Sequence, residues 1–147
     1  MTRTLALALA VTLGATPALT DSFATHELDE SFDDAAFALE SEIVAHGLVI
    51  DLVSHVGPML ARTKEDVGGT VDLFDDARIY IFCSATVSRA VMETDPMNLR
   101  HCPYGIHLYS MADGGAVTVG HIVYSDDSMA PVNDLLATIV AGAFPLD

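Results

Sequence analysis

The fold of this chain is organised around RIYIFC, residues 78–83, which runs through SATVSRAVMETDPMNLR (84–100) into HCPYGIHLY (101–109). β-Branched and aromatic residues predict a strand over 79–83. A helix is expected over 85–93, and Pro96 begins a connection to the next strand. The two cysteines of the chain, Cys83 and Cys102, bracket this helix and its connection.

Residues 104–111 and 116–124 predict two strands joined at Asp113-Gly114, a dipeptide typical of β-hairpins. Pairing Leu108 with Val119 keeps the apolar residues of both strands on one side, whereas a shift by one residue would mix the two sides. That register predicts a core side formed by Tyr104, Ile106, Leu108, Val117, Val119, His121 and Val123. The opposite side, here called the hairpin face, is expected to carry His107, Tyr109, Met111, Thr118, Gly120, Ile122 and Tyr124.

The other segments complete an alternating order of strands and helices. A strand is expected over 23–29, followed by a helix that Ser31 caps and Gly47 ends. A strand over 48–56 is expected to place Leu48, Ile50 and Leu52 on one side. A short helix over 58–67 and a last helix capped by Ser128 follow. The order β-α-β-(α)-β-α-β-β-α predicts an α+β fold, with a mixed, largely antiparallel sheet and helices packed on one face.

The N-terminus has the pattern of a secretory signal peptide over residues 1–20. Arg3 precedes an apolar run from Leu5 to Leu13, and small residues around Ala18 and Thr20 offer a cleavage site. We therefore expect a periplasmic or secreted protein with a single domain over 21–147 and no membrane association after cleavage. The net charge of −15 disfavours nucleic acid and anionic lipid as partners.

Several stretches resemble the DUF302 family, a domain of unknown function, over roughly residues 23–144. The resemblance is carried by Ser31-Phe32, Gly47, Cys83-Ser84-Ala85, Pro103 and Asp113-Gly114. It implies a compact α+β fold like that of the TATA-binding protein, often dimeric, without nucleic-acid binding and with no catalytic residues to carry over. Many relatives have Asn-Pro at Cys83-Ser84 and Leu-Pro at Cys102-Pro103, so both cysteines stand where this chain departs from the family pattern.

Two cysteines in an exported protein predict a disulfide between Cys83 and Cys102. A redox-active pair of cysteines is the less favoured interpretation, because there is no C-x-x-C motif. The remaining alternative is a periplasmic protein that handles metal or haem. Its ligands would come from a set whose soft donors suit Cu(I): Met92, Met97, His101 and Cys102. Apart from that alternative, we expect no cofactor.

No motif in the sequence specifies a reaction. H-E-x-x-H, G-x-S-x-G, the Walker loop and the dinucleotide fingerprint are all absent from it. The hairpin face lacks charge in an otherwise acidic chain, which favours a surface for a second copy, for a periplasmic protein partner or for a small ligand. We therefore expect a non-enzymatic binding or interaction domain, homodimeric and stabilised by one disulfide.

Overall fold

The computed structural model describes residues 20–145, so the predicted signal peptide lies outside the described residues apart from Thr20. The elements follow the predicted order: β1 (Ser22–Leu28), α1 (Phe32–Ala45), β2 (Val49–His55), α2 (Val56–Thr63), β3 (Phe74–Cys83), α3 (Ala85–Thr94), the 3-10 helix η1 (Pro96–His101), β4 (Tyr104–Met111), β5 (Val117–Val123), the 3-10 helix η2 (Asp127–Met129) and α4 (Ala130–Ala143). The strands form a five-stranded sheet in the order β1-β5-β4-β3-β2. Every pairing in it is antiparallel.

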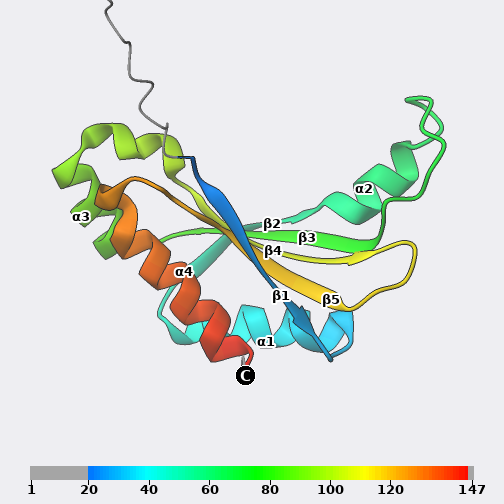
Figure 1. Cartoon of the computed structure of the whole chain (residues 1–147), viewed down its shortest axis with the longest axis horizontal. Coiled ribbons are helices and arrows are strands. Elements are labelled where there is room, and N and C mark those ends of the chain that lie inside the picture. Colours follow the sequence, from blue (N-terminus) through cyan, green and yellow to red (C-terminus); the bar gives the residue numbers. More distant parts are fainter. Residues whose placement is uncertain (1–19, 146–147) are drawn as a thin grey trace, which may run out of the picture.

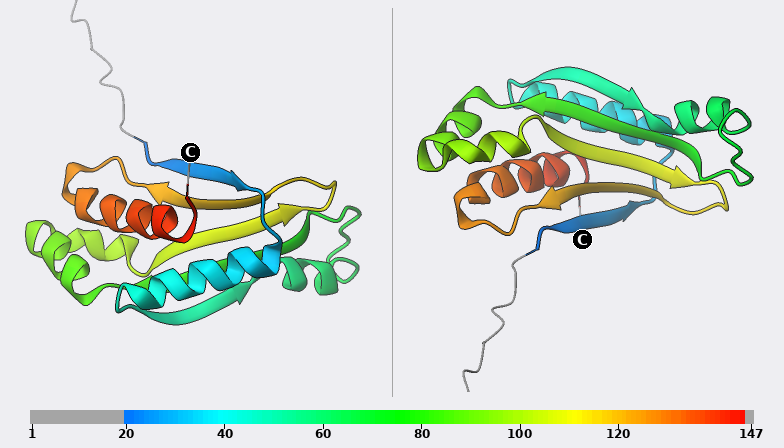
Figure 2. Two further views of the ribbon diagram at one scale, coloured as in Figure 1. Left: turned by 90° about the horizontal axis from the view of Figure 1, so that it is seen from below. Right: turned by 90° about the horizontal axis from the view of Figure 1, so that it is seen from above.

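The sheet has one covered face and one open face. Helices α1 and α4 lie side by side beneath it, while α2 and α3 stand at its two ends (Figures 1 and 2). Viewed from above, no helix covers the central strands (Figure 2, right). The prediction of helices packed on one face of the sheet is therefore confirmed.

Local signals at both ends of α1 explain why that helix could be predicted from the sequence. The Ser31 Oγ accepts a hydrogen bond from the Asp34 backbone N–H at 3.2 Å and donates one to the Asp34 carboxylate at 2.6 Å. At the other end, Gly47 has a φ of +74°. The N–H groups of Gly47 and Leu48 donate back to the carbonyls of Val44 and Ile43, the Schellman pattern that ends many helices.

The core lies between the sheet and the layer formed by α1 and α4. Its largest fully buried side chains include Tyr80, Phe82, Tyr104, Leu39, Ile43, Leu136 and Phe144. Helix α1 supplies four buried residues, Ala35, Ala36, Leu39 and Ile43, and its first residue, Phe32, is partly buried. The interior is thus built from the inward faces of α1 and α4 and from one face of each central strand.

The hairpin has the predicted register. Leu108 is the partner of Val119, and Ile106 is the partner of His121. The side predicted for the core is buried at every position except Val123, which is partly exposed. The connecting turn contains Gly114 at a φ of +81°, the backbone conformation that Asp-Gly turns supply.

The predicted alternation of β2 was wrong. A β-bulge between Ile50 and Leu52 leaves Asp51 without a partner on β3. Ile50 and Val53 therefore face the core, whereas Leu52 is 55% exposed on the opposite side. A bulge shifts the two-residue period of the strand by one position, and the apolar pattern of the sequence did not indicate this bulge.

Several element boundaries also differ from the predictions. The helix predicted over 58–67 is α2, which begins at Val56 and ends at Thr63. Strand β3 begins at Phe74, five residues before the predicted start, because a second irregularity between Phe74 and Asp76 accommodates the acidic residues there. Ser128 does not cap α4. It lies within η2, whose cap is Asp126, and α4 begins at Ala130 without a side-chain cap. Within the described part of the chain, no helix is both long and apolar enough to cross a membrane.

Candidate functional site

The open face brings together residues from four strands in two cross-strand rows. In one row, Thr25, Gly120, His107 and Ile79 are successive ladder partners from β1 to β3. In the next row, Glu27, Thr118, Tyr109 and Ala77 are partners in the same way. Directly opposed residues in an antiparallel sheet share a face. His107 and Tyr109 therefore lie at the centre of the open face.

Gly120 leaves the space that a neighbouring aromatic ring occupies. A Cβ atom at Gly120 would lie 2.7 Å from the Phe23 ring and 2.9 Å from the backbone oxygen of Ala24. The Phe23 ring consequently lies over β5 and meets the His107 ring edge to face, with 5.2 Å between the ring centroids. The missing side chain of Gly120 thus allows the edge strand to contribute an aromatic ring to the centre of the face.

A second aromatic pair lies beside the first. The rings of Phe74 and Tyr109 meet edge to face with 6.1 Å between their centroids. Between the two pairs and the start of α2 lies a groove of about 390 Å³. We call it the aromatic groove, and its lining residues are Phe23, Val56, Phe74, Ala77, Arg78, Ile79, His107, Leu108, Tyr109 and Met111. Its volume lies within the range of small-ligand sites.

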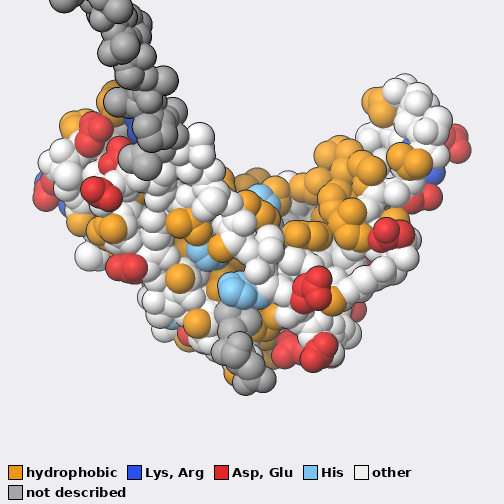
Figure 3. Space-filling model, viewed as in Figure 1, with side chains coloured by type: hydrophobic (Ala, Val, Ile, Leu, Met, Phe, Trp, Pro, Cys, Tyr) orange, Lys and Arg blue, Asp and Glu red, His pale blue; other side chains and the backbone are white. Residues whose placement is uncertain are grey.

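The open face is hollow, and helix α2 forms one wall of this hollow because Gly57 lets the helix approach β3 closely. A Cβ atom on Gly57 would lie 2.6 Å from the Ala77 backbone nitrogen. The space-filling view shows hydrophobic side chains along this wall and a histidine at the bottom of the hollow between the two raised ends of the molecule (Figure 3). The open face is thus a concave apolar surface rather than a flat one.

His107 is held in its neutral form by its surroundings. Burial lowers the pKa of the His107 ring below its usual value of 6.5, and the nearby His121 lowers it further. Within residues 20–145, no protein group forms a hydrogen bond with the His107 ring. At neutral pH the groove therefore offers an uncharged imidazole whose nitrogens can donate to or accept from a ligand.

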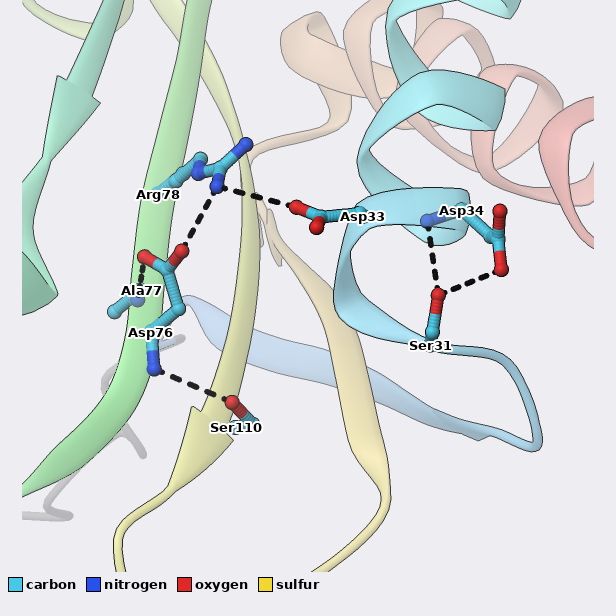
Figure 4. Close-up of polar contacts among 7 residues, drawn as sticks. All are labelled: Ser31, Asp33, Asp34, Asp76, Ala77, Arg78 and Ser110. Carbon is cyan, nitrogen blue, oxygen red and sulfur yellow. Dashed lines mark hydrogen bonds and ion pairs between the residues drawn. The ribbon is translucent and has the colours of Figure 1, made fainter.

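Arg78 borders the aromatic groove, but its charge is directed to the other side of the sheet (Figure 4). The guanidinium lies 2.8 Å from the Asp76 carboxylate and 3.6 Å from that of Asp33 at the start of α1. It also stacks on the Phe32 ring, 4.8 Å from the ring centroid. These contacts engage the cation in the layer between sheet and helix, away from the open face.

Most residues predicted for the hairpin face do lie on the open face, with one correction. Thr118 and Ile122 are partly buried there, and Met111 is 42% exposed. Tyr124 instead belongs to the core, because β5 ends at Val123 and the alternation ends with it. The side chain of Asn133 on α4 pairs with both the N–H and the carbonyl of Tyr124, at 2.9 Å each, which fixes the chain in that position.

The two cysteines lie next to each other at one end of the sheet. The sulfur atoms of Cys83 and Cys102 are 2.7 Å apart, and the two residues are not bonded. Burial, together with the contact to Cys102, raises the pKa of the Cys83 thiol to about 11. A thiol with so high a pKa is a poor nucleophile at neutral pH, which is the property of a structural cysteine rather than a catalytic one.

The four residues considered as soft-metal ligands have other neighbours in the structure. Met92 packs against the core, and Met97 is 63% exposed. The His101 ring accepts a hydrogen bond from Arg100 at 2.9 Å and meets the Tyr124 ring at 4.6 Å between centroids. Over the described residues, no three His, Cys, Asp or Glu side chains gather closely enough to hold a metal ion.

Sequence reasoning missed the part of the site that lies outside the hairpin. Phe23 and Phe74 reach the groove from β1 and from the start of β3, and Ile79 lies between the two aromatic pairs. The strand order that places β1 beside β5 has no local signal in the sequence. The glycine at position 120, in the middle of a strand, was the available hint, because such glycines often mark a close approach by another group.

The fold and the face define an α+β domain with a five-stranded antiparallel sheet that is open on one side. The family model of DUF302, described as a domain of unknown function, matches residues 24–141, and the chain belongs to this family. Its fold is similar to that in the crystal structure of an uncharacterised conserved DUF302 protein from Bacillus stearothermophilus. The TM-score is 0.65 at 13% sequence identity, covering 83% of this chain and 98% of that one. No match was found among the curated proteins.

Proposed function

We propose that this protein is an exported, non-enzymatic binding domain that holds a small, largely apolar ligand in the aromatic groove. The observation that carries the proposal is the groove itself, about 390 Å³ in volume and lined by aromatic and aliphatic side chains on the face that no helix covers. Tyr109 and His107 supply the polar groups that would orient the ligand. Sites of this kind combine an apolar lining with a few polar groups.

The shape of the open face favours a small ligand over a second copy of the chain. The face is hollow between α2 at one end and the α3 region at the other (Figures 1 and 3). A second copy would have to present a matching convex surface, whereas a small molecule needs contact with the groove alone. A homodimer formed through this same face is the competing proposal, and one experiment distinguishes the two.

The test uses N-phenylnaphthylamine, an uncharged dye that fluoresces in apolar surroundings. We expect the wild-type monomer to bind the dye and Tyr109→Asp to lose at least tenfold in affinity, because a carboxylate would be placed in the groove. Phe37→Asp is the matched control, since Phe37 is 75% exposed on α1, on the other side of the sheet. Sedimentation of the same three proteins measures their oligomeric state.

Two results would overturn the ligand proposal. One is the absence of dye binding by the wild-type protein. The other is a wild-type dimer that Tyr109→Asp converts into a folded monomer, which would assign the open face to self-association.

A further inference from the structure

We infer that the ligand of the aromatic groove is an organic cation, such as a quaternary or aromatic ammonium compound. This inference rests on the proposed ligand-binding function and adds the chemical class of the ligand. It is carried by three features of the open face: its aromatic lining, its lack of cationic side chains and its one carboxylate.

The aromatic lining offers the surfaces that bind cations. Phe23, Phe74 and Tyr109 all line one groove, together with the His107 ring. Both pairs meet edge to face, at 5.2 Å and 6.1 Å between centroids, so the rings are inclined to one another rather than stacked. An aromatic ring attracts a cation that lies over its face within about 6 Å of the ring centroid. Several rings around one groove give such a cation more than one partner.

The charges of the open face also favour a cationic ligand. Among the described strand residues whose ladder partners place them on this face, none is a lysine or an arginine. Glu27 is the one carboxylate at those positions, four residues along β1 from Phe23 and opposite Thr118. Asp75, exposed at the irregularity of β3, directly follows Phe74. The exposed ionised groups of these strands on the open face are therefore acidic, although neither Glu27 nor Asp75 lines the groove itself.

Arg78 and His107 are the two groups at the groove that could carry a positive charge, and neither provides a free cation there. Arg78, which borders it, is paired with Asp76 and Asp33 on the helix side of the sheet. His107 stays neutral near pH 7, because burial disfavours its charged form. The whole chain carries a formal charge of −15, so its long-range field attracts cations and repels anions. An anionic ligand would meet no compensating charge in the groove.

The experiment compares three probes that share a benzene ring and differ in charge: phenyltrimethylammonium, its neutral isostere tert-butylbenzene, and benzenesulfonate. Binding is followed by NMR titration of the His107 and Tyr109 ring signals at low ionic strength. We expect the cation to bind about threefold to thirtyfold more tightly than the neutral isostere. Benzenesulfonate should not bind. Because Glu27 is exposed, added salt should reduce the preference for the cation.

A charge-matched pair of variants locates the effect. Glu27→Gln should lower the ratio of cation to neutral affinity, whereas Glu93→Gln should leave it unchanged. Glu93 is exposed on α3 and paired there with Arg89, and its substitution alters the net charge by the same amount.

The outcomes separate this inference from the function on which it rests. Equal affinity for phenyltrimethylammonium and tert-butylbenzene would overturn the cation class and leave the apolar ligand site standing. Preferential binding of benzenesulfonate would overturn it as well. If neither these probes nor N-phenylnaphthylamine bound, both the cation class and the ligand-binding proposal would be wrong.

Discussion

At the scale of single residues, Gly120 shows how one missing side chain shapes the open face. An added Cβ atom would come within 3 Å of both the Phe23 ring and the Ala24 backbone oxygen. The ring could turn aside, but the backbone oxygen belongs to the paired strand β1 and could not move without disturbing the ladder. Overpacking of this kind typically costs about 1–3 kcal/mol.

We therefore predict that Gly120→Ala lowers the free energy of unfolding by about 1–3 kcal/mol in urea denaturation. Gly115→Ala is the control, because no atom lies within 4 Å of a Cβ placed there. That substitution should change the stability by less than about 0.5 kcal/mol. Equal stabilities for Gly120→Ala and wild type would show that β1 is not held against β5 as described.

His107 provides a prediction about pH. Its pKa is lowered in the folded state, so the unfolded chain binds the proton more readily. The contribution of His107 to stability is therefore fully present above about pH 6.5 and is lost as the pH falls towards the lowered folded-state pKa. The wild-type protein should lose stability between pH 7.5 and pH 5 more steeply than His107→Gln does. The variant His26→Gln removes an exposed histidine from β1 and should follow the wild-type curve.

At the scale of elements, the helix α1 has a start that depends on one hydroxyl. The Ser31 Oγ satisfies the Asp34 N–H and also binds its carboxylate. Ser31→Ala should lower the free energy of unfolding by about 0.5–2 kcal/mol, the usual cost of removing such a cap. Ser41→Ala, at an exposed interior position of the same helix, should have little effect. The difference in urea midpoint between these two variants measures the cap.

The elements also show which sequence signals were sufficient to predict the structure. Short-range devices such as the Ser31 cap, Gly47 and the Asp113-Gly114 turn act within a few residues, so the sequence pattern revealed them. The hairpin register was predictable because the buried side of each strand had to match. The bulge at Asp51 and the inward turn of Tyr124 depend on partners distant in the sequence, on β3 and α4 respectively.

The open face was predicted in part for the same reason. His107 and Tyr109 alternate with core residues along β4, so their side of the sheet followed from the period of the strand. Phe23 and Phe74 join them only because β1 lies beside β5 and β3 lies beside β4. That arrangement is a property of the whole sheet rather than of any one segment.

At the scale of the whole molecule, layering separates the charged groups from the apolar open face. The helices α1 and α4 cover one face of the sheet and enclose the core, and Arg78 is neutralised by Asp76 and Asp33 between sheet and helix. The exposed acidic residues make the surface strongly negative, while the middle of the open face stays apolar. A single fold thus combines an acidic exterior with an apolar hollow on the open face.

The two cysteines allow a prediction about the state of the whole protein in an oxidising compartment. They lie at the end of β3 and just before β4, with their sulfur atoms 2.7 Å apart. Exchange with a low-molecular-weight disulfide such as oxidised glutathione would join Cys83 to Cys102. The reagent would accept the two electrons and two protons and leave as two molecules of thiol. The thiolate of one cysteine would attack the reagent to form a mixed disulfide, and the other cysteine would then displace the second molecule of thiol.

The bond would close a loop of 18 intervening residues and so restrict the unfolded chain. On the loop-entropy model this stabilises the protein by about 3 kcal/mol. We predict that protein isolated from the periplasm lacks the signal sequence by intact mass, yields a Cys83–Cys102 peptide under non-reducing conditions, and loses about 3 kcal/mol of unfolding free energy on reduction. The double variant Cys83→Ala/Cys102→Ala should be insensitive to the reductant. If both cysteines of the isolated protein were alkylated without reduction, the disulfide would be excluded, and the proximity of the sulfur atoms would need another explanation, such as a bound soft metal.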